Sequence, residues 1–143
     1  MRDYKKILLC LDLTEESETI AARAKALAAT FGAELTLLHV VEYVPVEPMG
    51  ETLLPAVQIE EELVNRARQR LGELADELGL ASAPRTVATG NIKAEIVRVA
   101  QEQGSDLVVL GSRERHGLSI MVNFTEDTIL HAASCDVLAV RIK

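Results

Sequence analysis

The residues whose types and spacing could do chemistry are concentrated between Asp106 and Thr125. An apolar run, Leu107 to Leu110, predicts a strand buried on both faces, and a polar loop with two glycines, Gly111 and Gly117, follows it. Apolar residues then recur at the spacing of one helical face, which predicts a helix after the loop. A strand, a loop and a helix start suit an anionic ligand, because N–H groups at the helix start face the crevice above the strand ends. The sequence therefore predicts a ligand crevice here.

Catalytic and metal-ligating residues are few. The histidines, His39, His116 and His131, are scattered, and no serine or cysteine stands at a recognisable spacing from a histidine and an acid. Cys10 and Cys135 fit neither a disulfide framework nor a metal-ligand spacing, and we expect them to be small buried apolar side chains. Neither a nucleophile with its base nor a metal cluster can be identified. No required cofactor, and no enzyme activity beyond slow nucleotide hydrolysis at most, is therefore expected.

The turn after the first strand, Asp12 to Ser17, narrows the class of site. It contains no glycine, which excludes the dinucleotide-binding fingerprint and the P-loop, because both use glycine backbone to cradle phosphate. Response-regulator domains share this order of elements, but their phosphorylation site needs several acids clustered at the strand ends. Asp12 has no such cluster around it, so the sequence does not predict a phosphorylation site.

Size and composition indicate one globular domain. A chain of 143 residues is long enough to bury a sizeable core. Its net charge of −7 and aromatic content of 3% disfavour nucleic acid and anionic membranes as partners, since both favour a cationic surface. The apolar run near the N-terminus, Ile7 to Leu11, is too short for a signal peptide or a membrane span, so a cytoplasmic protein is expected.

Strands and helices alternate along the chain. Thr14 and Asn91 are candidate helix caps, and Gly32 and Gly104 are candidate helix ends. Strands that alternate with helices pair in parallel through crossovers, which predicts a single doubly wound α/β domain with helices on both faces of the sheet. The predicted strands are Lys5 to Leu11, Glu34 to Val41, Arg85 to Thr89, Leu107 to Leu110 and Asp136 to Arg141.

The second predicted helix follows an unusually long connection. The segment from Glu42 to Pro55 contains three prolines, and a connection of this length inside a compact domain usually binds a ligand or closes over one. The helix itself runs from about Gln58 to Leu78, with one apolar and one charged face. Its apolar face is predicted to contain Leu63, Ala67, Leu71, Leu74, Ala75 and Leu78.

Four segments together resemble the universal stress protein family: YKKILLCLDLTEESE from Tyr4, LLHVVE from Leu37, GNIKAEIVRVAQEQGSDLVVLGS from Gly90, and HAASCDVLAVR from His131. The resemblance covers the chain apart from the connection between Glu42 and Gln58. It implies a five-stranded parallel sheet in the order 3-2-1-4-5 and a homodimer. It also implies an ATP site in one branch of the family, whereas the branch typified by universal stress protein A does not bind ATP.

The glycine loop departs from the pattern of the ATP-binding branch, which is Gly-x2-Gly-x9-Gly-Ser/Thr. Counted from Gly111, Thr125 matches the hydroxyl position, but Glu114 and Phe124 replace the second and third glycines. A carboxylate about 5 Å from a phosphate costs roughly 3 kcal/mol per phosphate charge at an effective dielectric of about 20. Thr125 can equally bond its own helix backbone. Tight ATP binding is therefore disfavoured.

Other positions favour a nucleotide. In the family, the positions that correspond to Asp12, Val40 and Leu110 receive adenine and ribose. Arg113 adds positive charge to the loop, and Gly117 supplies part of the missing flexibility. Structural alternatives stand beside these roles: Asp12 can end the first strand and accept N–H bonds from its own loop, while Val40 and Leu110 can be core residues.

Three functions remain open. The first is a non-catalytic stress-response homodimer that acts through protein partners and binds ATP or AMP weakly at most. The second is an ATP or AMP sensor that uses the crevice, and the third is a nucleotide-hydrolysing or nucleotidyl-transferring enzyme, for which base and metal ligands are missing. The homodimer is expected to pair through the uncharged edge of the fifth strand. The residues of that edge are Val137, Leu138, Ala139 and Val140.

Overall fold

The computed structural model describes residues 3–14, 16–42, 56–113 and 132–142. Within these ranges the strands are β1 (Lys6–Cys10), β2 (Glu34–Val41), β3 (Arg85–Thr89), β4 (Leu107–Arg113) and β5 (Asp136–Ile142). The helices are α1 (Ser17–Phe31), α2 (Ala56–Glu77) and α3 (Ile92–Gln103). None of these three helices is long and apolar enough to cross a membrane.

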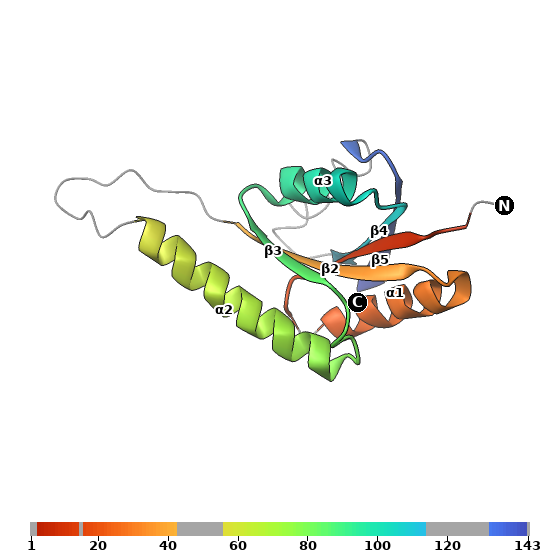
Figure 1. Ribbon diagram of the computed structural model, residues 1–143, viewed down its shortest axis with the longest axis horizontal. Coiled ribbons are helices and arrows are strands. Elements are labelled where there is room, and N and C mark those ends of the chain that lie inside the picture. Colours follow the sequence, from red (N-terminus) through yellow and green to blue (C-terminus); the bar gives the residue numbers. More distant parts are fainter. Residues whose placement is uncertain (1–2, 15, 43–55, 114–131, 143) are drawn as a thin grey trace.

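The five strands form one parallel sheet in the order β3-β2-β1-β4-β5. Helices α1 and α2 lie on one face of the sheet, and α3 lies on the other (Figure 1). The expected doubly wound fold and strand order are therefore confirmed. From β1 the sheet grows on one side through β2 and β3 and on the other through β4 and β5. The carboxyl ends of β1 and β4 thus flank the point where open α/β sheets bind ligands.

The core has two layers because the central strand is buried on both faces. Ile7 and Leu9 pack toward α1 and α2, whereas Leu8 packs toward α3. In β2, Leu37 and Leu38 divide between the two layers in the same way. This double burial explains why β1 reads as an uninterrupted apolar run rather than as an alternating one.

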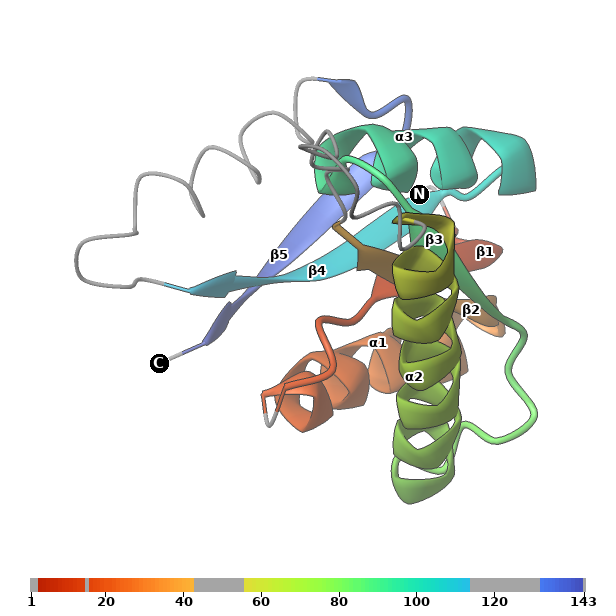
Figure 2. The ribbon, with the colours of Figure 1, turned by 90° about the vertical axis from the view of Figure 1, so that its left-hand side faces the viewer.

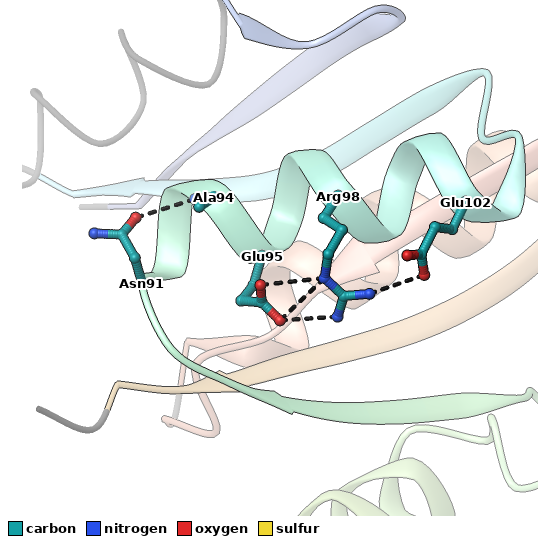
Figure 3. Close-up of polar contacts among 5 residues, drawn as sticks. All are labelled: Asn91, Ala94, Glu95, Arg98 and Glu102. Atoms are coloured by element: carbon teal, nitrogen blue, oxygen red, sulfur yellow. Dashed lines mark hydrogen bonds and ion pairs between the residues drawn. The ribbon is translucent and has the colours of Figure 1, made fainter. Parts of the chain in front are cut away.

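Side chains and glycines define the helix ends. The side-chain oxygen of Asn91 accepts a hydrogen bond from the Ala94 N–H at 3.0 Å, so Asn91 caps α3 as predicted (Figure 3). Gly32 and Gly104 end α1 and α3 in the left-handed conformation, also as predicted.

The exposed face of α3 carries a short ladder of ion pairs. The Arg98 guanidinium lies 2.8 Å from a carboxylate oxygen of Glu95 and 2.8 Å from one of Glu102 (Figure 3). Hydrogen bonds from Arg98 lower the pKa of Glu95 below its ordinary value, although partial burial acts against this effect. Glu95 therefore stays ionised to lower pH in the folded protein than in the unfolded chain.

The N-terminal end of helix α2 extends past the carboxyl ends of β2 and β3 (Figures 1 and 2). Leu71, Leu74 and Ala75 in its C-terminal half are buried, as predicted. Leu63, predicted to lie on the same apolar face, is 36% exposed, and the prediction is wrong there. The helical period identifies a face, but it does not say how far along the helix the sheet lies beneath that face.

Hydrogen bonds at the amino ends of the strands join residues that are far apart in the sequence. The Asp106 carboxylate accepts the backbone N–H groups of Lys5 and Lys6 at 2.6 and 2.9 Å. The Asp136 N–H donates to the Asp106 carbonyl at 3.2 Å, and the Tyr4 hydroxyl donates to the Asp136 carboxylate at 2.8 Å. Strands β1, β4 and β5 are thus fixed to one another at the end opposite the crevice.

Candidate functional site at the strand ends

The predicted crevice lies at the carboxyl ends of β1 and β4, which are neighbours in the sheet. Asp12 follows shortly after β1, and Gly111 lies within β4. Gly117 and Thr125 lie outside the described residues. Of the predicted crevice, the structure therefore describes only the strand ends and the turn between β1 and α1.

The Asp12 carboxylate organises that turn. Its Oδ1 atom accepts hydrogen bonds from the Thr14 N–H at 3.1 Å, the Thr14 hydroxyl at 2.7 Å and the Ser17 hydroxyl at 3.4 Å. Leu13 takes a left-handed φ of 64°, which a leucine adopts only where its surroundings hold it. The structural role considered for Asp12, accepting an N–H bond from its loop, is confirmed. Its Oδ2 atom has no hydrogen-bond partner among the described residues.

Thr14 does not cap α1, contrary to the sequence prediction. The helix begins at Ser17, which is fully buried, and no side chain caps it. The Thr14 hydroxyl instead donates to the Asp12 carboxylate, and the helix begins two residues later than a cap at Thr14 would require. The Asp-x-Thr spacing that produces this local turn was the signal that the capping prediction missed.

His39 fixes the end of β1 from the neighbouring strand. Its Nδ1 atom lies 2.7 Å from the Leu11 carbonyl oxygen. A carbonyl only accepts hydrogen bonds, so Nδ1 carries the proton that it donates to Leu11. Sequence reasoning assigned His39 no role. The register that pairs Cys10 with Leu38 brings His39 beside Leu11, and that register cannot be read from either strand alone.

The other predicted contact residues lie in strands. Val40 and Leu110 are 8% and 7% exposed and pack in the core on the α3 side. The alternative that both are core residues is therefore confirmed. Gly111 and Arg113 were predicted to lie in a loop, but β4 continues through both and pairs with β5. Strand β4 extends beyond its apolar residues because β5 pairs with its backbone as far as Ile142. Backbone pairing does not require apolar side chains.

The two cysteines are free thiols that pack against the core on the α3 side. Burial, and secondarily the Cys135 thiol, raises the pKa of Cys10 to about 12. A thiol with that pKa stays protonated at neutral pH and is not a nucleophile. In the described ranges, no group of three His, Cys, Asp or Glu side chains could hold a metal ion.

The described part of the predicted crevice offers a ligand one oxygen of the Asp12 carboxylate. Asp12 Oδ2 can accept a hydrogen bond from a ligand hydroxyl, but Oδ1 is engaged in holding the turn. His39 Nδ1 is likewise engaged with Leu11. Asp12 and His39 therefore hold the turn in place through hydrogen bonds. A ligand would bind to a turn whose conformation these bonds already fix.

Comparison with known proteins identifies the family of this chain. The sequence profile of the Universal stress protein family matches residues 3–141. The chain is 38% identical to Universal stress protein A homolog 2 of Coxiella burnetii, over 100% of this chain and 99% of that protein. Universal stress protein UspA from Lactobacillus plantarum has a TM-score of 0.77 at 20% identity, with 99% of this chain and 100% of that chain covered. A universal stress protein solved in complex with cAMP has a TM-score of 0.63 at 20% identity, with 97% and 98% covered. The chain therefore belongs to the universal stress protein family.

Proposed function

We propose that the protein is a non-catalytic, cytoplasmic stress-response protein that acts as a homodimer through protein partners and binds adenine nucleotides weakly at most. Full-length similarity to a Universal stress protein A homolog supports the stress-response role. The weak nucleotide binding rests on the Asp12 turn. Because Thr14 and Ser17 already occupy Oδ1, a ligand can use only Oδ2 without breaking the turn.

The sequence of the glycine loop supports the same proposal. Glu114 and Phe124 stand where the ATP-binding branch has glycines, and both lie outside the described residues. The Glu114 carboxylate near the phosphates would repel them. Calorimetric titration with ATP and AMP tests this part, and we expect dissociation constants in the range of about 1 mM. Micromolar binding, or nucleotide released when the purified protein is denatured, would contradict it.

The homodimer is proposed to form through the outer edge of β5, which has no strand beside it among the described residues. The Asp136 N–H donates toward β4, to the Asp106 carbonyl. Since the backbone groups of successive residues point to opposite sides of a strand, those of Val137 and Ala139 face away from β4. Ala139 is also exposed, so this edge can accept a second copy of itself.

A single substitution tests this edge without touching the β4–β5 ladder. Ala139→Pro removes an N–H that faces outward, whereas Ala139→Ser keeps it and serves as the control. Light scattering should show a dimer for wild type and the serine variant, and a monomer for the proline variant. Leu138 is less suitable because its side chain packs against the core on the α1 side. A wild type that is monomeric at micromolar concentration would overturn the proposed dimer.

An adenine-nucleotide sensor is the second candidate. It is favoured by the Oδ2 atom of Asp12, which has no partner among the described residues and could accept ribose hydroxyl groups. The relative solved with cAMP supports a small adenine ligand in this class of fold. Micromolar binding of AMP or cAMP that is lost in Asp12→Ala, with the fold retained, would favour the sensor over the first proposal.

A further inference from the structure

A cavity of about 570 Å³ lies between α2 and the carboxyl end of β3. Val64 of α2 and Val87 of β3 provide apolar surface in its walls. The cavity is at the β3 edge of the sheet, opposite the β5 edge, and away from the strand ends that flank the crevice. It is therefore distinct from the predicted crevice and from the β5 edge, and its volume is in the range of typical ligand sites.

Among the described residues, no strand pairs with the outer edge of β3, which lies beside this cavity. On the inner side of β3, the Pro84 carbonyl accepts the Leu37 N–H at 2.9 Å, and the Gly90 N–H donates to the Val41 carbonyl at 3.0 Å. Even-numbered positions of β3 thus point toward β2. The N–H and C=O groups of the odd-numbered positions point away from β2, toward the free edge of the sheet. The residues of β3 that line the cavity, Val87 and Thr89, are both odd-numbered.

The charges on α2 fall into two groups. On the outer face, Arg66 pairs with Glu62 at 2.7 Å, and Arg70 lies 3.8 Å from each of two glutamates. Three charged residues line the cavity and form no ion pair with any described residue: Glu60, Glu61 and Arg68. The charged residues named on the outer face therefore pair with one another within α2. The charged residues that line the cavity can pair with charges on a ligand.

The spacing of these charges matches an extended chain. Glu60 and Arg68 are eight positions apart, which is about 12 Å along a helix at 1.5 Å per residue. An extended peptide covers about 12 Å in roughly four residues, and residues four apart on a strand point to the same side. A basic residue opposite Glu60 and an acidic residue opposite Arg68 would thus both face α2.

We propose that this cleft binds an extended segment of a partner protein, which adds a strand to the free edge of β3. Hydrogen bonds to the backbone of Val87 and Thr89 would supply affinity, and one basic and one acidic side chain, four positions apart, would set the register against α2. Val64 contributes apolar contact. The inference rests on the proposed action through protein partners and specifies the kind of segment that such a partner presents.

Two capped pentapeptides, Lys-Val-Thr-Val-Glu and Glu-Val-Thr-Val-Lys, test the cleft for both strand directions. In nitrogen-15 NMR spectra of the full-length protein, at least one peptide should shift the amide signals of Val87 and Thr89. The same peptide with alternate amides N-methylated should not, because it cannot pair with a strand. If neither peptide shifts these signals at millimolar concentration, or if the shifts fall on Val137 and Ala139 of β5, the proposal is wrong.

A charge reversal with a matched control tests the register. Arg68→Glu should weaken the bound peptide about tenfold, and a peptide in which lysine replaces the glutamate should recover most of this loss. Arg66→Glu makes the same charge change on the outer face and should alter binding less than twofold. Equal losses for the two variants would mean unspecific charge attraction and would overturn the proposal.

A backbone substitution tests strand addition itself. Thr89→Pro removes an N–H that faces away from β2, whereas Thr89→Val removes only the hydroxyl and keeps the N–H. With folding confirmed by circular dichroism, only the proline variant should lose the peptide. Shifts at Val87 that depend on protein concentration without peptide would assign the cleft to a second copy and refute the proposal. Nucleotide calorimetry and light scattering report on other surfaces, so failure here would not be confused with failure of the proposed nucleotide binding or dimer.

Discussion

Replacing His39 with leucine should loosen the turn that carries Asp12. The imidazole Nδ1–H donates to the Leu11 carbonyl at 2.7 Å, and leucine keeps similar bulk but has no donor. A hydrogen bond of this kind contributes about 0.5–1.5 kcal/mol, and an acceptor left buried without a donor costs about 1–3 kcal/mol. Because the His39 side chain is only half-buried, water can replace part of the bond. We therefore expect a loss of about 1–2 kcal/mol in the free energy of unfolding.

His39→Asn is the matched control, because its side-chain amide can place an N–H close to the position of Nδ1. Urea denaturation should show that asparagine recovers at least half of the stability lost with leucine. Amide hydrogen exchange adds a local measurement: the Thr14 N–H, bonded to Asp12, should exchange faster in His39→Leu. The Ala94 N–H, bonded to Asn91 at the start of α3, should be unchanged. Equal stability of the two variants, with unchanged exchange at Thr14, would refute the reasoning.

Three further outcomes follow from the fold and the loop. Asn91→Ala should cost about 1 kcal/mol in urea denaturation, because the α3 cap is lost, and equal stability of wild type and variant would refute the cap. Arg98→Met should destabilise at pH 7, and the difference should shrink as the pH falls below 4.5: the pKa of Glu95 is lowered in the folded state, so its contribution is present above its ordinary pKa and lost on acidification. A pH-independent difference between wild type and this variant would contradict that assignment. Glu114→Gly combined with Phe124→Gly should raise ATP affinity roughly thirty- to a hundredfold by calorimetry, the equivalent of about 2–3 kcal/mol, provided that circular dichroism shows a folded protein.

Elements bounded by local signals were predictable. The apolar strand β2 lies between Gly32, which ends α1, and the first residue of the long connection, and its predicted limits match the structure. The ends of α3 were also predicted, because Asn91 and Gly104 act on backbone groups within a few residues of themselves. In both cases the residues that set the ends of the element lie within the element or next to it in the sequence.

Features that depend on a partner elsewhere in the chain were not predictable. Gly111 belongs to a strand because β5 extends far enough to pair with it, and no property of the β4 sequence reveals that length. Leu63 is exposed because α2 extends past the strand ends, which the helical period does not encode. The candidate site shows the same division: Asp12 was identified from its position after β1, whereas the contact from His39 required the register between two strands.

The hydrogen bonds between Asp106 and the start of β1 have a consequence for how the chain reaches its fold. They join positions 101 and 100 residues apart, so the centre of the sheet closes only after most of the chain exists. Closing a loop of about 100 residues carries an entropic cost of about 4 kcal/mol, and at roughly 5–20 residues per second a ribosome needs about 5–20 s to deliver β4 after β1. During that interval Ile7 to Leu9 form an uncovered apolar edge at what later becomes the middle of the sheet. A nascent chain that ends before Leu107 should therefore be a chaperone substrate, and premature termination at this point should produce aggregates rather than a smaller soluble domain.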